Sequence, residues 1–257
     1  MEQESPGDVR FLLVHHTVNA NDYPPEAVPG LLQSIYGIHT GEKGWSDVAY
    51  NFFIDQHGGV WEGRAGSLTA PMKGDATGGS QGFGLLCSFV GDHRTVPPTE
   101  AAADSMVRLL AWLADTYGID TTPGATTDFV SRGSNRHPAG VSVTTSTIAG
   151  HRDMSSTECP GDAAYRLVLE EFPPRVDLLR VTTGLAEATT TTTAASATTD
   201  PTVSAPGTST TVASGDATAP AGAGSTSVPW AAAGVGGLIG LGAFGAALAL
   251  RRRRSAG

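Results

Sequence analysis

Cysteine is nearly absent from the sequence: Cys87 and Cys159 are the only two among 257 residues. Two cysteines are too few for the disulfide framework that stabilises small secreted scaffolds, and we expect these two not to pair with each other. Cys87 lies in the apolar run 84–90, which predicts a buried strand and a thiol that behaves as a small core residue. Cys159 lies in a polar segment, so it needs a different explanation.

Basic residues are scarce outside the C-terminal end. The chain has 16 Lys and Arg against 25 Asp and Glu, a formal net charge of -9, and four of the arginines form the run 251–254. The rest of the chain is therefore distinctly acidic. It lacks the patch of cations that neutralises phosphates, which argues against nucleic acid as a partner and against binding of the folded part to anionic membrane surfaces.

Large apolar residues are missing from 189–228, which consists almost entirely of Thr, Ala, Ser, Pro and Gly. Such a composition does not bury enough apolar surface to offset the entropy lost on folding. We therefore expect a disordered, stalk-like linker over 183–229. We assign one folded domain to 8–178, where apolar runs alternate with turn signals over a length sufficient for a hydrophobic core.

Residues 231–250 carry no charge and end at the run of four arginines. A helix of about 20 residues spans ~30 Å, the thickness of the hydrocarbon core, so we predict one transmembrane helix there. A basic cytoplasmic tail follows over 251–257. Because the segment is rich in Gly and Ala, an interfacial or cleaved tail is the alternative interpretation.

The arginine run also predicts an orientation, because basic residues beside a membrane helix stay in the cytoplasm. The folded domain is then extracytoplasmic, in a protein that crosses the cell membrane once. The first ten residues, MEQESPGDVR, contain no apolar stretch of the kind found in a secretory signal. The sequence therefore leaves the route of export open.

The apolar pattern within 8–178 predicts an α/β fold, in which helices flank a central mixed β-sheet. Its clearest element is a long amphipathic helix, for which Thr99 is a typical N-cap and Gly118 a typical terminator. The expected strands are 9–14, 50–55, 60–63, 84–90 and 145–149, and the expected helices are 26–39, 98–117 and 161–171.

Two histidines and the second cysteine offer a candidate zinc site. A catalytic zinc ion takes three protein ligands from His, Cys and carboxylate side chains and keeps a fourth position open. His15 directly follows an apolar strand, and His151 and Cys159 lie at the two ends of a polar loop able to curl around one ion. No general rule for zinc requires that spacing, and a histidine at a strand end is more often a core or surface residue.

Five motifs occur in order along the folded part: VHHT at 14–17, GWSDVAYNF at 44–52, GGVWEGR at 58–64, GHRD at 150–153 and TECPG at 157–161. Together they resemble the zinc-dependent N-acetylmuramoyl-L-alanine amidases of type 2, a family that includes the peptidoglycan recognition proteins and the phage lysozyme-type amidases. The resemblance runs from about Arg10 to Val176. It implies a central mixed sheet flanked by helices, with a substrate groove over one face and zinc at its floor.

The resemblance also implies roles for single residues. His15, His151 and Cys159 would hold Zn2+, and Tyr50 and Thr157 would be catalytic. The reaction is hydrolysis of the amide that joins the lactyl group of muramic acid to L-alanine in peptidoglycan, with Tyr50 facing the attacking water and Thr157 donating to the tetrahedral intermediate. Relatives that only bind peptidoglycan commonly lack the cysteine, so Cys159 favours catalysis.

His16 competes with His15 for the first ligand position, because neighbours on a strand point to opposite faces and only one of them reaches the metal. The family pattern favours His15. Glu62 is a weaker candidate for a catalytic carboxylate, and the general base stays unassigned. Four other histidines are interpreted as surface or turn residues: His39, His57, His93 and His137.

Two other functions remain open at this stage. One is a non-catalytic peptidoglycan-binding module displayed on a membrane-anchored stalk, and the other is a surface adhesion or structural protein that uses an enzyme fold. The insertion-like segment 126–141 is expected to form a loop beside the groove. The sequence does not give the stem-peptide or glycan preference, the biological role of cleavage, or the oligomeric state.

Overall fold

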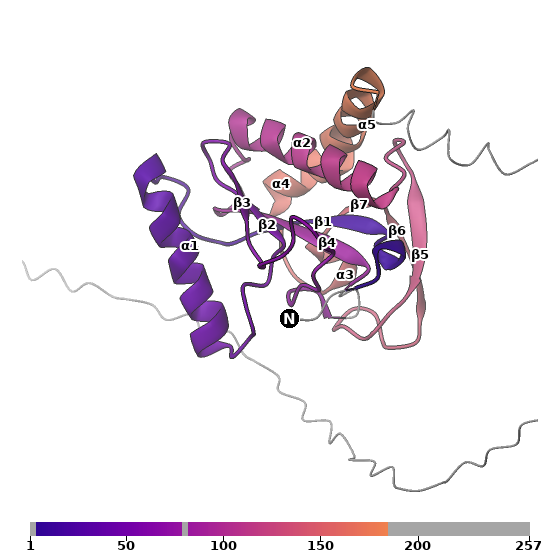
Figure 1. Cartoon of the computed structure of the whole chain (residues 1–257), viewed down its shortest axis with the longest axis horizontal. Helices are drawn as coiled ribbons and strands as arrows, with labels where there is room; N and C mark the ends of the chain where they lie inside the picture. The colour runs from indigo at the N-terminus through magenta and orange to yellow at the C-terminus, as the bar shows by residue number, and fades with distance from the viewer. Residues whose placement is uncertain (1–3, 79–81, 185–257) are drawn as a thin grey trace, which may run out of the picture. The chain divides into compact units, whose positions relative to one another are not determined.

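A computed structural model describes residues 4–78 and 82–184, which fold around a five-stranded sheet (Figure 1). The strand order is β3-β2-β4-β1-β7, in which β3 runs antiparallel to β2 and the other neighbours are parallel. The strands are β1 Phe11–His16, β2 Phe52–Ile54, β3 Val60–Glu62, β4 Gly84–Phe89 and β7 Ile148–Gly150. The predicted α/β fold with a central mixed sheet flanked by helices is therefore confirmed.

One face of the sheet is covered by two long helices, α2 (Glu100–Tyr117) and α5 (Phe172–Thr182). Side chains alternate along a strand, so Leu12 and Val14 of β1 both point into this layer. The predicted N-cap of α2 is confirmed, because the Thr99 hydroxyl accepts a hydrogen bond from the Ala102 amide at 3.1 Å. Gly118 ends the helix in the left-handed conformation, as expected.

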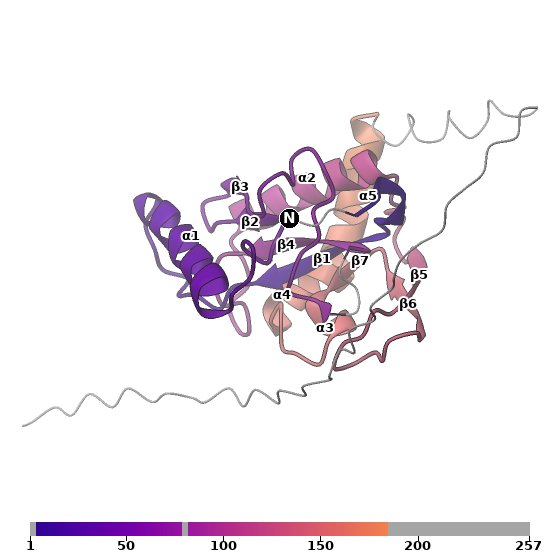
Figure 2. The same cartoon turned by 60° about the horizontal axis from the view of Figure 1, so that its bottom comes forward.

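The other face is covered in two places. Phe11 and Leu13 pack beneath the antiparallel hairpin of β5 (Thr126–Val130) and β6 (Ser142–Ser146), whereas Phe53 packs against α1 (Val28–Gly37). Figure 2 shows α1 near one edge of the sheet, beside β3 and β2, and the hairpin near the other edge, beside β7. His15 follows Leu13 on this face, and its neighbour in β4 is Ser88, which in turn pairs with Phe53. His15 therefore lies between the two covered regions.

The remaining helical segments are short. Two π-helical turns, with wider hydrogen bonding than an α-helix, extend α1 and join α4 to α5. These elements are α3 His151–Met154, α4 Asp162–Arg166, the π-helical turns Ile38–Glu42 and Leu167–Glu171, and the 3₁₀ turns Pro6–Asp8 and Pro25–Ala27.

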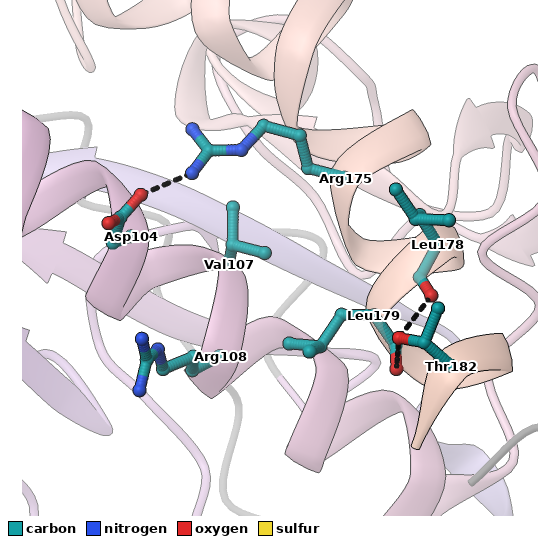
Figure 3. Close-up of a pocket in the computed structure, with 7 residues that line it drawn as sticks. All are labelled: Asp104, Val107, Arg108, Arg175, Leu178, Leu179 and Thr182. Atoms are coloured by element: carbon teal, nitrogen blue, oxygen red, sulfur yellow. Dashed lines mark hydrogen bonds and ion pairs between the residues drawn. The ribbon is translucent and has the colours of Figure 1, made fainter. Parts of the chain in front are cut away.

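An open, largely apolar pocket lies between α2 and α5 (Figure 3). Val107 and Leu179 line it, and an ion pair between Arg175 and Asp104 stands at its edge. Because α2 and α5 cover the face opposite His15, this pocket does not belong to the region where the candidate ligands lie.

Three sequence expectations were wrong. The expected strand 145–149 is divided between the end of β6 and the start of β7, which belong to different sheets. The segment 126–141 is not a plain loop, since it contributes β5 and the turn of a hairpin whose inward side chains Phe129 and Val143 are buried. The last helix does not end before Pro173, because Pro173 and Pro174 occupy the first turn of α5, where backbone amides have no partner within the helix.

The predicted linker over 183–229 lies, from residue 185 on, outside the described residues, as do the predicted membrane helix at 231–250 and basic tail at 251–257. Within 4–78 and 82–184, every helix is too short or too polar to cross a membrane.

The α2 cap gives a direct test of the fold. Thr99→Ala removes both the acceptor for the Ala102 amide and the hydroxyl that donates to the Gln56 carbonyl at 2.6 Å. We expect it to lower the free energy of unfolding by about 1 kcal/mol in urea titrations. Thr116→Ala, in the exposed last turn of the same helix, is the matched control and should change it by less than about 0.5 kcal/mol.

Candidate metal centre

His15 and His151 meet because their strands are parallel neighbours. Val14 of β1 is in register with Gly150 of β7, so His15, which follows Val14 within β1, and His151, which follows the last residue of β7, lie at the same end of the two strands. Gly150 ends β7 and His151 begins α3. As a result the two imidazole rings lie 4.5 Å apart between centroids.

Cys159 completes the group from the loop between α3 and α4. Its Sγ lies 3.6 Å from Nδ1 of His15, and one ligand atom from each of His15, His151 and Cys159 lies within 4.8 Å of the others. The structure therefore brings together the three side chains that the sequence analysis proposed as metal ligands. Cys87, in contrast, is a fully buried free thiol in β4, as expected for a core residue, and the two cysteines are not paired.

The loop that carries His151 and Cys159 is held by its own hydrogen bonds. The Arg152 amide donates to the Cys159 carbonyl at 3.0 Å, and the Arg152 guanidinium lies 4.6 Å above the Tyr165 ring. Asp153 accepts from the Gly150 amide at 2.8 Å and from the Tyr165 hydroxyl at 2.6 Å. A side chain at Gly150 would collide with the Tyr165 ring, 2.8 Å from the place of its Cβ. These contacts fix the loop against α4.

The donor set fits a metal ion. His15 is fully buried, and within the described part of the chain its Nε2 has no hydrogen-bond partner. A buried ring nitrogen without a partner is rare in folded proteins, and a bound ion is one explanation for it. Two imidazoles and one thiol are also the ligands that zinc prefers, and three protein ligands leave a fourth position for a reacting group.

Burial controls the protonation of the group. Burial, followed by the charge of His16, lowers the pKa of His151 to about 4, and burial lowers the pKa of His15 well below its usual value. Burial also raises the pKa of the Cys159 thiol to about 12, against the His16 amide and Arg152, which lower it. Without a cation the group therefore holds neutral imidazoles and a thiol, and binding of a metal displaces the thiol proton.

His16 points away from this group. Its Nδ1 accepts a hydrogen bond from the His93 amide at 3.1 Å, on the same side of β1 as Leu12 and Val14. The structure thus brings His15, rather than His16, together with His151 and Cys159.

Tyr50 and Thr157 contact the three candidate ligands in different ways. The Tyr50 ring lies 5.2 Å from the His15 ring, and burial, reinforced by Cys159, raises the pKa of its phenol. Thr157 is exposed, and its Oγ1 accepts a hydrogen bond from the Cys159 amide at 3.2 Å. Tyr50 therefore contacts the group directly, and Thr157 touches it through the backbone of Cys159.

Two histidines interpreted as surface or turn residues are buried, so that interpretation was wrong for them. His39 lies between Trp45 and Tyr50, with ring centroids 4.9 and 5.8 Å away, and its Nδ1 accepts from the Ala49 amide at 3.1 Å. His93 is buried beside β1. The rings of Trp45, His39, Tyr50 and His15 contact one another in that order. The presence of Trp45 and Tyr50 in one motif was the sequence signal that could have predicted the burial of His39.

Three further residues considered in the sequence analysis, Glu62, His57 and His137, lie outside the candidate ligand set. Glu62 accepts hydrogen bonds from the Gly66 and Leu68 amides, each at 3.0 Å, so its carboxylate holds a loop. His57 is exposed in the turn between β2 and β3, and His137 is partly exposed in the connection between β5 and β6, as expected.

The neutral histidines predict a pH dependence of the metal-free protein. The unfolded chain protonates His151 near 6.5 and the folded chain near 4, so between these values the unfolded state binds more protons. The free energy of unfolding should therefore fall as the pH is lowered through this window, measured by urea titration. His151→Gln should weaken the dependence, and Thr116→Ala, which removes no titratable group, should leave it unchanged. Equal stability across the window would contradict the prediction.

The chain is similar to N-acetylmuramoyl-L-alanine amidases and to peptidoglycan recognition proteins. A family model described as N-acetylmuramoyl-L-alanine amidase matches residues 5–162. Peptidoglycan recognition protein 1 of Mus musculus is 29% identical over 163 residues, 62% of this chain and 74% of the mouse protein. The N-acetylmuramoyl-L-alanine amidase of Homo sapiens is 31% identical over 166 residues, 62% of this chain and 23% of the human protein. The crystal structure of Drosophila peptidoglycan recognition protein SD shares the fold, with a TM-score of 0.52 and 18% identity over 66% of this chain and 84% of that one. This chain belongs to the N-acetylmuramoyl-L-alanine amidase family.

Proposed function

We propose that the domain is a zinc-dependent amidase that hydrolyses the bond between the lactyl group of muramic acid and L-alanine in peptidoglycan. The observation that carries this proposal is the meeting of His15, His151 and Cys159, with a buried His15 nitrogen that has no other partner among the described residues. Membership of the amidase family supplies the class of substrate. The ligand set supports catalysis in addition to binding.

The three proposed ligands and the two proposed catalytic residues have different roles. His15, His151 and Cys159 would hold the ion, and a bound zinc ion activates water and polarises a carbonyl. Tyr50 stays protonated because its phenol pKa is raised, so it is a hydrogen-bond donor for the oxygen of the amide under attack. Thr157, exposed beside Cys159, presents a second hydroxyl on the solvent side of the group.

A purely binding role is the second candidate, and the similarity to peptidoglycan recognition proteins favours it. In that case the surface around His15, His151 and Cys159 would hold muropeptides without cleaving them. The two functions differ at Cys159, because a binding module does not need the thiol.

The composition of the C-terminal part suggests where in the cell the domain acts. We propose that residues 183–229 act as a stalk and 231–250 as a single membrane helix, with 251–257 in the cytoplasm, because of their composition and the arginine run. The zinc group would then work outside the membrane, where peptidoglycan lies. Protease accessibility of the folded domain in intact cells, with the arginine tail protected, is the expected result.

The enzymatic proposal is tested by incubating the full chain with purified muropeptides. New L-alanine N-termini should appear, disappear with a chelator and return with added zinc. Cys159→Ala should abolish release, whereas Cys87→Ala, at the core cysteine, should retain it. Zinc-loaded protein that releases nothing, yet binds sacculi as well with Cys159→Ala as without, would establish the binding module instead.

Tyr50 and Thr157 are tested separately from metal binding. Tyr50→Phe removes one donor to the developing oxyanion and should lower kcat by ~100- to 1000-fold, with the zinc content unchanged. Thr157→Ala should lower kcat in the same direction. Tyr36→Phe, at an exposed tyrosine of α1, is the matched control. Unchanged kcat in Tyr50→Phe would remove Tyr50 from the mechanism.

A further inference from the structure

His16, the last residue of β1, is buried on the face opposite His15, where it acts as a hydrogen-bond acceptor. Its Nδ1 accepts from the backbone amide of His93 at 3.1 Å. A ring nitrogen that accepts from an amide carries no proton, so the imidazole is neutral with its hydrogen on Nε2. The side chain thus anchors the turn 92–94, which follows β4.

The segment 92–94 also sets the position of α4. The His93 carbonyl accepts hydrogen bonds from the amides of Ala163 and Ala164, at 3.1 and 3.4 Å, in the first turn of the helix. Gly161, just before the helix, has φ 88°, and a Cβ there would lie 2.2 Å from the His93 carbonyl carbon. The His93 backbone therefore occupies the space that only a glycine leaves at this position.

Both the backbone and the sulfur of Cys159 are positioned by contacts with this part of the structure. It lies two residues before Gly161, so the contact between Gly161 and His93 limits where its backbone runs. Its Sγ also accepts a hydrogen bond from the His16 amide at 3.4 Å, within the buried group. The backbone of His16 contacts the sulfur, and the side chain of His16 holds the turn against which the cysteine loop rests.

We propose that His16 is a positioning residue of the metal centre, which places the Cys159 sulfur beside His15 and His151 through His93 and the N-terminus of α4. The inference rests on the proposed zinc function. Strand β1 then supplies a ligand from one face and the support of another ligand from the other. A hydrophobic side chain of similar size would fill the space but leave the buried His93 amide without an acceptor.

The substitutions follow from the position of the acceptor. His16→Asn keeps an acceptor atom near the place of Nδ1, whereas His16→Leu removes it. In the full chain, measured by competition with a chelating indicator, His16→Leu should weaken zinc binding by ~10- to 100-fold. His16→Asn should bind zinc close to the wild-type affinity. His16→Gln, whose acceptor stands one carbon further out, should behave as the Leu variant and replaces it in the comparison if the Leu variant does not fold.

A control separates positioning from general stability. Thr121→Val removes a buried acceptor of Arg180, 2.9 Å away in another part of the fold, and should reduce thermal stability without changing the zinc affinity. If Thr121→Val weakens zinc binding as much as His16→Leu at equal loss of stability, the role of His16 is structural and the proposal is overturned.

A second readout uses no zinc at all. In metal-free protein, the rate at which a thiol-disulfide reagent modifies Cys159 reports how the sulfur is held, since Cys87 is fully buried. His16→Leu and His16→Gln should react faster than the wild type, and His16→Asn should not. Wild-type rates in all three variants would overturn the proposal, even if the chain were found to bind zinc. Failure of the wild type to bind zinc would overturn the proposed function and leave this thiol result to decide the role of His16 in holding Cys159.

Discussion

The parallel pairing of β1 with β7 decides whether this fold has a metal centre. In register, Val14 lies opposite Gly150, and each is followed by a histidine, so His15 and His151 lie at the same end of the two strands. A shift of one residue would turn His15 to the other face, where Leu12 and Val14 now pack below α2 and α5. The register is fixed by the buried residues on both faces of β1, so the core and the candidate site depend on the same strand.

The third ligand depends on contacts of another kind. Cys159 comes from a loop, and loops hold a side chain in place only when other groups support them. Here the support comes from the Arg152 and Asp153 contacts on one side and from the turn at His93 on the other. Burial of the thiol keeps it protonated in the absence of a cation, which links occupancy of the centre to release of a proton.

The sequence predicted the parts of this structure that depend on local pattern. The sheet strands, the α2 helix and its Thr99 cap follow from apolar periodicity and capping, and Cys87 follows from its apolar run. The candidate ligands were found from motifs of a known family, since the spacing of His151 and Cys159 alone does not specify zinc. What local pattern did not give are the consequences of long-range packing: the burial of His39 against Trp45 and of His93 against β1, and the hairpin built on Phe129 and Val143.

The central claim is that two histidines and one cysteine hold one zinc ion. X-ray absorption at the zinc edge of the zinc-loaded chain measures this directly. The expected spectrum has one sulfur at ~2.3 Å and two nitrogens at ~2.0–2.1 Å, and the sulfur should be lost in Cys159→Ala and kept in Cys87→Ala. A zinc shell without sulfur in the wild type, or one that keeps its sulfur in Cys159→Ala, would contradict the claim.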